Sequence, residues 1–200
     1  MKHTIAAILM AIVLAAARAW AEGNASTNLD NTLLALAVTD RPLRGGYLVV
    51  HPTAELHHRA TKRAKELKEL FGYVVGPGTN AVIELLVDRL FERNKTNGNG
   101  QARRLTLSSC LTNGYVVDHD GKYAKYFQTG GGGWPRFESE NPGAQGFVTL
   151  SLPAFDEQTG LVLVCRGTDL GFLSGQTEVI LYRYERGKLR RLFGYELERS

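Results

Sequence analysis

Leu161-Val162-Leu163-Val164-Cys165 is the stretch of this sequence that decides the fold. All five residues are apolar, so the run lacks the alternation of apolar and polar residues that marks a strand with one face in water. The turn-forming stretch Asp156 to Gly160 stands directly before it and favours a hairpin. We therefore expect Leu161 to Arg166 to form a central strand that is covered on both faces.

Further hairpins are predicted around this strand. Asp120-Gly121 and Arg186-Gly187 each separate two apolar or β-branched runs, and such dipeptides favour the positive φ angles of tight hairpin turns. Three hairpins predict a mainly antiparallel sheet in the C-terminal half of the chain. The other expected strands are Tyr47 to Val50, Leu105 to Leu111, Tyr115 to Val117, Lys122 to Gln128, Phe147 to Leu152, Glu178 to Tyr184 and Leu189 to Tyr195.

The N-terminal half shows helical spacing instead. Ala60, Ala64, Leu67 and Phe71 recur on one side of a helix that would end at a Gly72 cap. Helices first and hairpin strands later give an α+β fold, with two amphipathic helices packed on one face of the sheet. The length fits a single domain over residues 29–200. The expected helices cover Leu29 to Ala37, Glu55 to Phe71, and Thr79 or Asn80 to Asn94.

The first residues have the composition of an export signal. Lys2 and His3 precede an apolar run from Thr4 to Ala17, and small residues stand at −3 and −1 of a cut after Ala21. The run is too short to span a bilayer alone, so no transmembrane segment is expected in the mature chain. The sequence therefore predicts a signal peptide over residues 1–21, a flexible tail over 22–28, and a secreted or periplasmic protein.

Charge and composition exclude some classes of partner. At 44% hydrophobic and 22% charged, the composition is that of a globular protein. Loss of the leader removes Lys2 and Arg18 and lowers the formal net charge from +4 to +2. We expect no nucleic-acid partner, because export and this small charge both argue against one.

Cys110 and Cys165 are the only cysteines. An even pair in an exported chain favours one disulfide, which would stabilise the fold by about 4 kcal/mol through closure of a loop of about 55 residues. The alternative is a nucleophilic thiol, which needs a nearby base or a helix start to lower its pKa. Both cysteines stand in strand-like runs, so we expect the disulfide.

A series of landmark residues runs from Gly133 to Arg191. They are Trp134, Phe137, Pro142, Gly146, Leu150-Ser151, Phe155, Val162 to Cys165, Gly167, Leu173, Gly175, Val179 to Tyr184 and Gly187-Lys188-Leu189. Their order resembles an uncharacterised family of exported bacterial domains. The resemblance implies export and the fold class, but it implies no activity. Such domains carry a second cysteine where Ser174 stands here, so Cys165 would need the distant Cys110 as its partner.

Two polar groups are candidates for chemistry. The first, from His51 to His58, lies between the end of a strand and the start of a helix. Its imidazoles and carboxylate are ligand types that suit zinc, but the segment has no His-x-x-x-His spacing, so a solvated helix start is the simpler interpretation. The second, Asp118 to Gly121, is similar to part of a calcium loop but also fits a hairpin turn. We expect no bound metal and no cofactor. An alternative hypothesis is a small exported hydrolase or metal-dependent enzyme, which requires both groups to meet in a concave pocket. Its candidate residues are His51, His57, His58, Asp118 and His119, with Glu55 beside them.

Binding of another molecule is the leading hypothesis. Arg59, Lys62 and Arg63 give the first long helix a basic face, which is either its solvated side or a surface for an anionic partner. Trp134 and Phe137 lie in a glycine-rich segment and form a second candidate surface, suited to a module that plugs a cleft in another protein. We therefore expect an exported, non-catalytic domain that binds a protein or an anionic envelope component.

Overall fold

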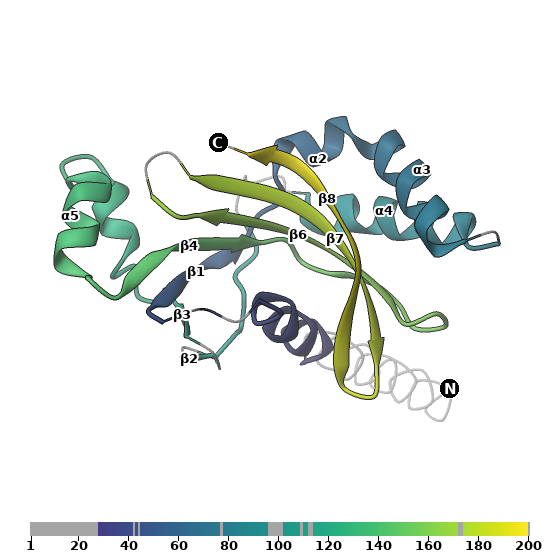
Figure 1. Cartoon of the computed structure of the whole chain (residues 1–200), viewed down its shortest axis with the longest axis horizontal. Helices are drawn as coiled ribbons and strands as arrows, with labels where there is room; N and C mark the ends of the chain where they lie inside the picture. The colour runs from purple at the N-terminus through teal and green to yellow at the C-terminus, as the bar shows by residue number, and fades with distance from the viewer. Residues whose placement is uncertain are drawn as a thin grey trace, which may run out of the picture.

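The computed structural model is an α+β fold built on one mixed sheet, with helices on both faces (Figure 1). The predicted signal peptide, and all of the predicted tail except Asn28, lie outside the described residues. Asn28 already belongs to a helical segment over 28–38. The structure describes residues 28–41, 43, 45–76, 78–95, 102–108, 110–111, 114–171 and 174–199.

The sheet contains eight strands within this part of the chain. Their order is β2-β3-β1-β4-β6-β7-β8, and β5 pairs with β6 beside this path. The strands are β1 (Tyr47–Ala54), β2 (Cys110–Leu111), β3 (Tyr115–Val117), β4 (Ala144–Leu150), β5 (Ala154–Asp156), β6 (Leu161–Asp169), β7 (Gly175–Glu185) and β8 (Lys188–Arg199).

β6 is the central, doubly covered strand that the sequence predicts. Its residues from Leu161 to Arg166 are all buried. The two hairpins predicted nearest to it are confirmed. The turn from Asp156 to Gly160 joins the antiparallel strands β5 and β6, and the turn at Arg186-Gly187 joins the antiparallel strands β7 and β8. β7 also pairs with β6 in antiparallel fashion. At the second turn Arg186 and Gly187 have φ angles of 51° and 76°, the conformation that a two-residue hairpin loop requires.

The prediction of a mainly antiparallel, hairpin-built sheet is correct only in part. β1 pairs in parallel with both β3 and β4. Parallel neighbours need a crossover connection, and the long segments that separate β1 from β3 and β3 from β4 provide it. The sheet is therefore mixed, with antiparallel pairing from β4 to β8 and also between β2 and β3.

The hairpin predicted at Asp120-Gly121 is wrong. The predicted strand from Lys122 to Gln128 does not form, because residues 124–127 form a 3₁₀ helix, η1 (Ala124–Phe127). The Asp118 carboxylate explains this outcome, since it accepts hydrogen bonds from the backbone N–H groups of Tyr123 and Ala124, the latter at 2.8 Å. A carboxylate in that position stabilises a helical turn instead of a strand.

Helices cover the two faces of the sheet unequally (Figure 1). One face carries α2 (His58–Lys62), α3 (Ala64–Val75) and α4 (Asn80–Asn94), of which the last two pack over β6 and β7 as predicted. The expected single helix is broken at Arg63 and continues through Gly72 to Val75. The helical segment 28–38 packs on the opposite face, and α5 (Gly133–Glu140) lies at the far end of the sheet. Within the described residues, no helix combines the length and apolarity needed to cross a bilayer.

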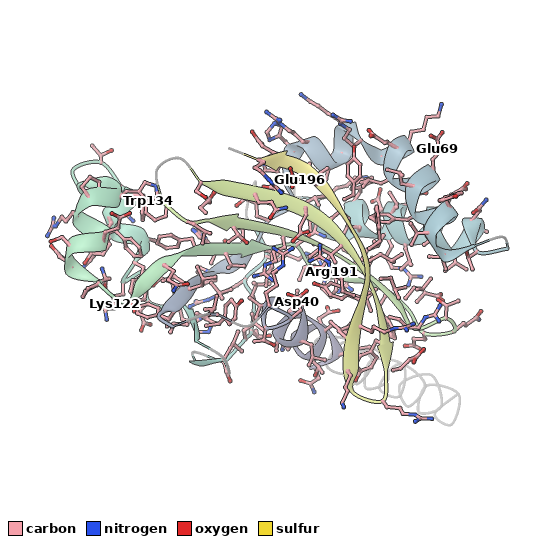
Figure 2. All side chains as sticks on the ribbon, viewed as in Figure 1. Asp40, Glu69, Lys122, Trp134, Arg191 and Glu196 are labelled. Carbon is pink, nitrogen blue, oxygen red and sulfur yellow. The ribbon has the colours of Figure 1, made fainter. Side chains whose placement is uncertain are left out.

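A buried ionic network fastens the helical segment to the sheet. Arg166 of β6 is 2% exposed and donates a hydrogen bond of 2.7 Å to Asp40, which follows the helical segment. The Tyr182 hydroxyl donates to the other oxygen of Asp40, also at 2.7 Å, and burial together with this carboxylate raises the pKa of Tyr182. Buried Glu178 accepts from Arg41 and Arg191, and Arg191 lies beside Asp40 (Figure 2). These contacts fix the helical segment against β6, β7 and β8.

The predicted disulfide between Cys110 and Cys165 is not formed. Cys165 is a free, buried thiol in β6. Cys110 lies in β2, four places away in the strand order, which corresponds to about 19 Å at the usual spacing between strands. A disulfide needs Cα atoms within about 7 Å of each other, so the fold separates the pair.

The ionic network predicts a large effect of Asp40→Ala on stability. The substitution leaves the Arg166 guanidinium buried without its carboxylate, which should lower the free energy of unfolding by about 3–5 kcal/mol. Asp88→Ala is the control, because its ion pair with Lys68 lies at the surface and is worth about 1 kcal/mol or less. Urea unfolding measures both variants, and equal losses would contradict this role for Asp40.

The separation of the cysteines predicts two free thiols in protein recovered without reductant from an oxidising compartment. Burial raises the pKa of the Cys165 thiol to about 12, so iodoacetamide should not modify Cys165 in the native protein at pH 8. In denaturant both cysteines should be alkylated, as peptide mass spectrometry can show. A linked pair of Cys110 and Cys165 peptides would contradict the strand order.

Candidate functional site

A pocket of about 720 Å³ lies on the sheet face that α2, α3 and α4 cover further along. On this face of β6, Leu161, Leu163 and Cys165 are packed beneath the helices. The next two residues that point the same way, Gly167 and Asp169, line the pocket instead. The pocket therefore occupies the part of the sheet between the end of the helical cover and the η1–α5 segment.

Two rows of paired residues form the floor of the pocket. Thr149 of β4, Gly167 of β6 and Thr177 of β7 make one row. Phe147, Asp169 and Gly175 make the next row. A Cβ atom at position 167 would lie 2.4 Å from the Thr149 hydroxyl oxygen, so glycine keeps the centre of the floor open.

Aromatic rings form one wall. Phe127 of η1 and Trp134 of α5 stand with their ring centres 5.0 Å apart, and each packs edge-on against Phe147 at 5.1 and 5.7 Å. Fully buried Phe137 supports all three rings from behind. Phe127 remains 44% exposed, so this wall presents apolar surface to the pocket.

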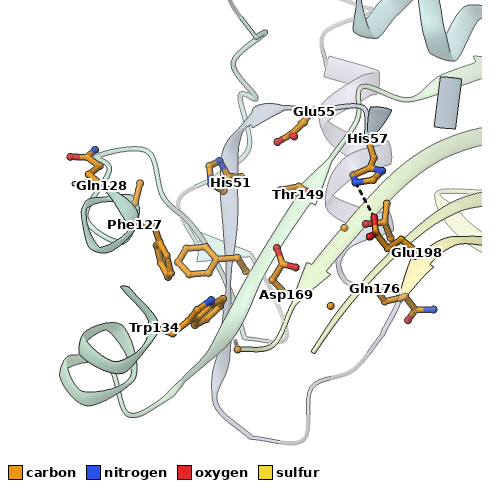
Figure 3. A pocket seen from close by; sticks show the side chains of 16 residues that line it. His51, Glu55, His57, Phe127, Gln128, Trp134, Thr149, Asp169, Gln176 and Glu198 are labelled. Atoms are coloured by element: carbon orange, nitrogen blue, oxygen red, sulfur yellow. Dashed lines mark ion pairs between the residues drawn. The ribbon is translucent and has the colours of Figure 1, made fainter. Parts of the chain in front are cut away.

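Carboxylates and imidazoles form a polar wall, which begins beside the aromatic rings at His51, whose ring centre lies 6.3 Å from that of Phe147 (Figure 3). His51 and Glu55 come from the end of β1 and the loop after it, and His57 is the N-cap of α2. The His57 ring lies 3.5 Å from the carboxylate of Glu198 in β8. Arg59 outside the pocket also contacts Glu198, at 3.1 Å.

Asp169 projects from the floor toward this polar wall (Figure 3). Its side chain is reachable from solvent, yet the pocket removes part of its hydration and this raises the pKa of the carboxyl group. The negative charge of Glu55 raises that pKa further, while His51 and His57 oppose the shift. The charges of Asp169 and Glu55 are therefore close enough to repel each other.

The predicted catalytic residues are brought together only in part. His51 and His57 line the pocket, and exposed His58 stacks on the His57 ring with centres 4.5 Å apart. The backbone of Asp118 adjoins β1, but its carboxylate is occupied by the η1 turn and it does not line the pocket. His119 turns away and contacts the Leu107 carbonyl at 2.7 Å. Only two of the five candidate residues of the hydrolase hypothesis, His51 and His57, therefore line the pocket.

The described residues supply no pair of nucleophile and base. None of their hydrogen bonds joins the ring of His51 or His57 to a serine, threonine or cysteine side chain. Likewise, in this part of the chain no group of three or more His, Cys, Asp or Glu side chains is placed to hold a metal ion.

The predicted partner-binding residues have mixed outcomes. Phe137 is fully buried and is not available to a partner, whereas Trp134 lines the pocket. On the helix, Arg59 pairs with Glu198, and Arg63 pairs with Glu66 at 2.6 Å. Lys62 is exposed and takes part in no ion pair between described residues. Acidic neighbours thus offset most of the basic face.

Sequence reasoning missed Asp169, Glu198 and Phe127. For Asp169 the sequence does contain a signal. The apolar run of β6 gives way to Gly167-Thr168-Asp169, and this change marks the point where the helices no longer cover the strand. Glu198 gives no local signal, since its proximity to His57 depends on how β8 crosses the sheet. The sequence predicts a strand at Phe127, whereas this residue belongs to the 3₁₀ turn η1 and lines the pocket.

Comparisons with known proteins found no match. No family model matches the chain, and neither a curated protein nor a solved structure matches it. The resemblance to exported bacterial domains over Gly133 to Arg191 stays a prediction. Function is therefore inferred from the geometry and charge of the pocket.

The charges in the pocket predict a lower Asp169 pKa in the variant Glu55→Gln. Removal of the Glu55 charge removes one of the causes that raise this pKa, so the value should move toward that of an ordinary aspartate. Carboxyl-carbon NMR titration measures the change. Glu157→Gln, on the β5–β6 turn, is the control and should leave Asp169 unchanged. An equal Asp169 pKa in the two variants would contradict the proximity of the carboxylates.

Proposed function

We propose that this chain is an exported, non-catalytic binding protein, and that its pocket holds a small organic molecule with an apolar end. The observation that carries the proposal is the two-sided pocket, with three aromatic rings on one wall and carboxylates and imidazoles on the other. Sites for small molecules commonly combine an apolar lining with a few convergent polar groups, in cavities of about 300–1,000 Å³. The volume of this pocket falls within that range.

Support for export comes from the first 21 residues of the sequence, whose pattern is that of a signal peptide. A macromolecular partner on the basic helix is less well supported. Its cations Arg59 and Arg63 already contact carboxylates of this chain, and the apolar side chain of Phe137 is buried. The concave pocket, with a volume of about 720 Å³, is therefore the better candidate for the recognition site.

A hydrolase remains the alternative function. It is favoured by the raised pKa of Asp169 beside two imidazoles, a combination that suits acid–base chemistry. It lacks a nucleophile joined to a base among the described residues. Binding requires only the pocket and its two walls, so we give it priority.

The fluorescence of Trp134 provides a direct test, because Trp20 and Trp134 are the only tryptophans. In a full chain that carries Trp20→Phe, 4-phenylbutanol should change Trp134 emission in a saturable way, since the phenyl ring would pack on the aromatic wall. The variant Thr177→Phe fills the floor of the pocket and should weaken this binding at least about tenfold. Thr168→Phe places the same ring on the neighbouring strand outside the pocket and is the matched control.

Two results would contradict the proposal. One is the absence of any saturable change with 4-phenylbutanol and with its charged analogues, 4-phenylbutylamine and 4-phenylbutyrate. The other is equal binding by the Thr177→Phe and Thr168→Phe variants, because that would place the probe outside the pocket. Circular dichroism of both variants checks that each is folded before the titrations are compared.

A further inference from the structure

The charges that line the pocket are unequal. Three carboxylates, those of Glu55, Asp169 and Glu198, face it, while no lysine or arginine is found among the described residues that line it. Arg59 contacts Glu198 from outside. Neither Glu55 nor Asp169 takes part in an ion pair within the described part of the chain. Two carboxylates of the pocket are thus left without a lysine or arginine partner among the described residues.

These two carboxylates also interact unfavourably with each other. The pocket lowers the hydration of Asp169, and the charge of Glu55 adds repulsion, so the ionised form of Asp169 is disfavoured. A cation placed between them would relieve the repulsion and restore the favourable interactions that hydration supplies elsewhere. His51 and His57, the other titratable groups on this wall, supply such a charge only when they are protonated.

The aromatic wall sets the length and polarity of the molecule that fits. Phe127 and Trp134 offer apolar ring faces and edges on the side of the pocket away from Glu55 (Figure 3), and the Phe147 ring packs edge-on against both. A molecule that spans the pocket therefore places an apolar group against the rings. Its other end reaches the carboxylates, where a charged hydrogen-bond donor matches their acceptor oxygens.

We propose that the ligand is an organic cation with an apolar or aromatic body, and that its ammonium group binds between Glu55 and Asp169. This inference rests on the proposed function and adds the chemical class of the ligand to it. A carboxylate ligand of the same shape would meet the repulsion that Asp169 already experiences. A neutral ligand would leave that repulsion unrelieved.

Three probes of equal length test the charge preference. These are 4-phenylbutylamine, 4-phenylbutanol and 4-phenylbutyrate, which share the phenyl ring and differ only in the group at the far end. At pH 7 the amine should bind about tenfold more tightly than the alcohol, and the butyrate should bind most weakly. Trp134 fluorescence in the full chain with Trp20→Phe reports all three titrations.

Two variants test the position of the ammonium group. Glu55→Gln and Asp169→Asn should each weaken the amine about tenfold and change the affinity for the alcohol less than about twofold. Glu157→Gln removes a carboxylate on a distant turn and is the matched control, with no expected effect on either probe. An alcohol affinity that falls together with the amine affinity would show a structural role for the two residues and would overturn the assignment.

The pH dependence gives an independent readout. As pH falls, protonation of Asp169, whose pKa is raised by lost hydration and by the charge of Glu55, removes negative charge from the pocket and weakens amine binding. His51 and His57 face the same carboxylate. The alcohol should show little change. The two possible failures are distinguishable. If no probe shows saturable binding, the proposed function is overturned. If the alcohol binds but the butyrate binds as tightly as the amine or more tightly, only the cationic nature of the ligand is overturned.

Discussion

The contact between Arg166 and Asp40 is the constraint on which the rest of the structure depends. Arg166 stands in the middle of the sheet where its neighbours on the same strand are apolar, and at 2% exposure its charge has lost nearly all contact with water. Burial of an ion pair is costly, and only good geometry with further hydrogen bonds offsets the lost hydration. Asp40 meets this condition because it also accepts from Tyr182, and the network continues through Glu178 to Arg41 and Arg191. Such a network specifies one position for the helical segment 28–38, which purely apolar packing would define less sharply.

Fixing that helical segment on one face decides what the opposite face can do. β6 passes through both layers, with Val162, Val164 and Arg166 on the side of the helical segment and Leu161, Leu163 and Cys165 beneath α3 and α4. The helices end near Cys165 and the aromatic cluster begins at Phe147, so a stretch of sheet between them stays open. The pocket is a consequence of this division.

Local patterns in the sequence predict local structure well and distant pairings badly. The uninterrupted apolar run of β6, the turn at Arg186-Gly187 and the bounds of α4 are all properties of consecutive residues, and the structure confirms them. The parallel pairing of β1 depends on how long connections cross the sheet, which no short pattern encodes. The same limit explains why the predicted disulfide is wrong. The composition indicates a pair of cysteines, but only the strand order shows how far apart Cys110 and Cys165 lie. Among the residues of the site, His51 and His57 lie close together in the sequence and are recognisable there as one polar group. Asp169 and Glu198 belong to strands more than a hundred residues later, so no local pattern connects them to the two histidines.

The repulsion between Glu55 and Asp169 links stability to the proposed function. A carboxyl group whose pKa is raised by folding binds its proton more tightly in the folded state than in the unfolded chain, so its contribution destabilises the fold as pH rises past the unfolded value. Unfavourable electrostatics are a feature of binding and active sites, where stability is lost in exchange for recognition. A ligand that supplies the missing positive charge removes the penalty, and the folded protein then gains stability from the same residues that weaken it when the pocket is empty.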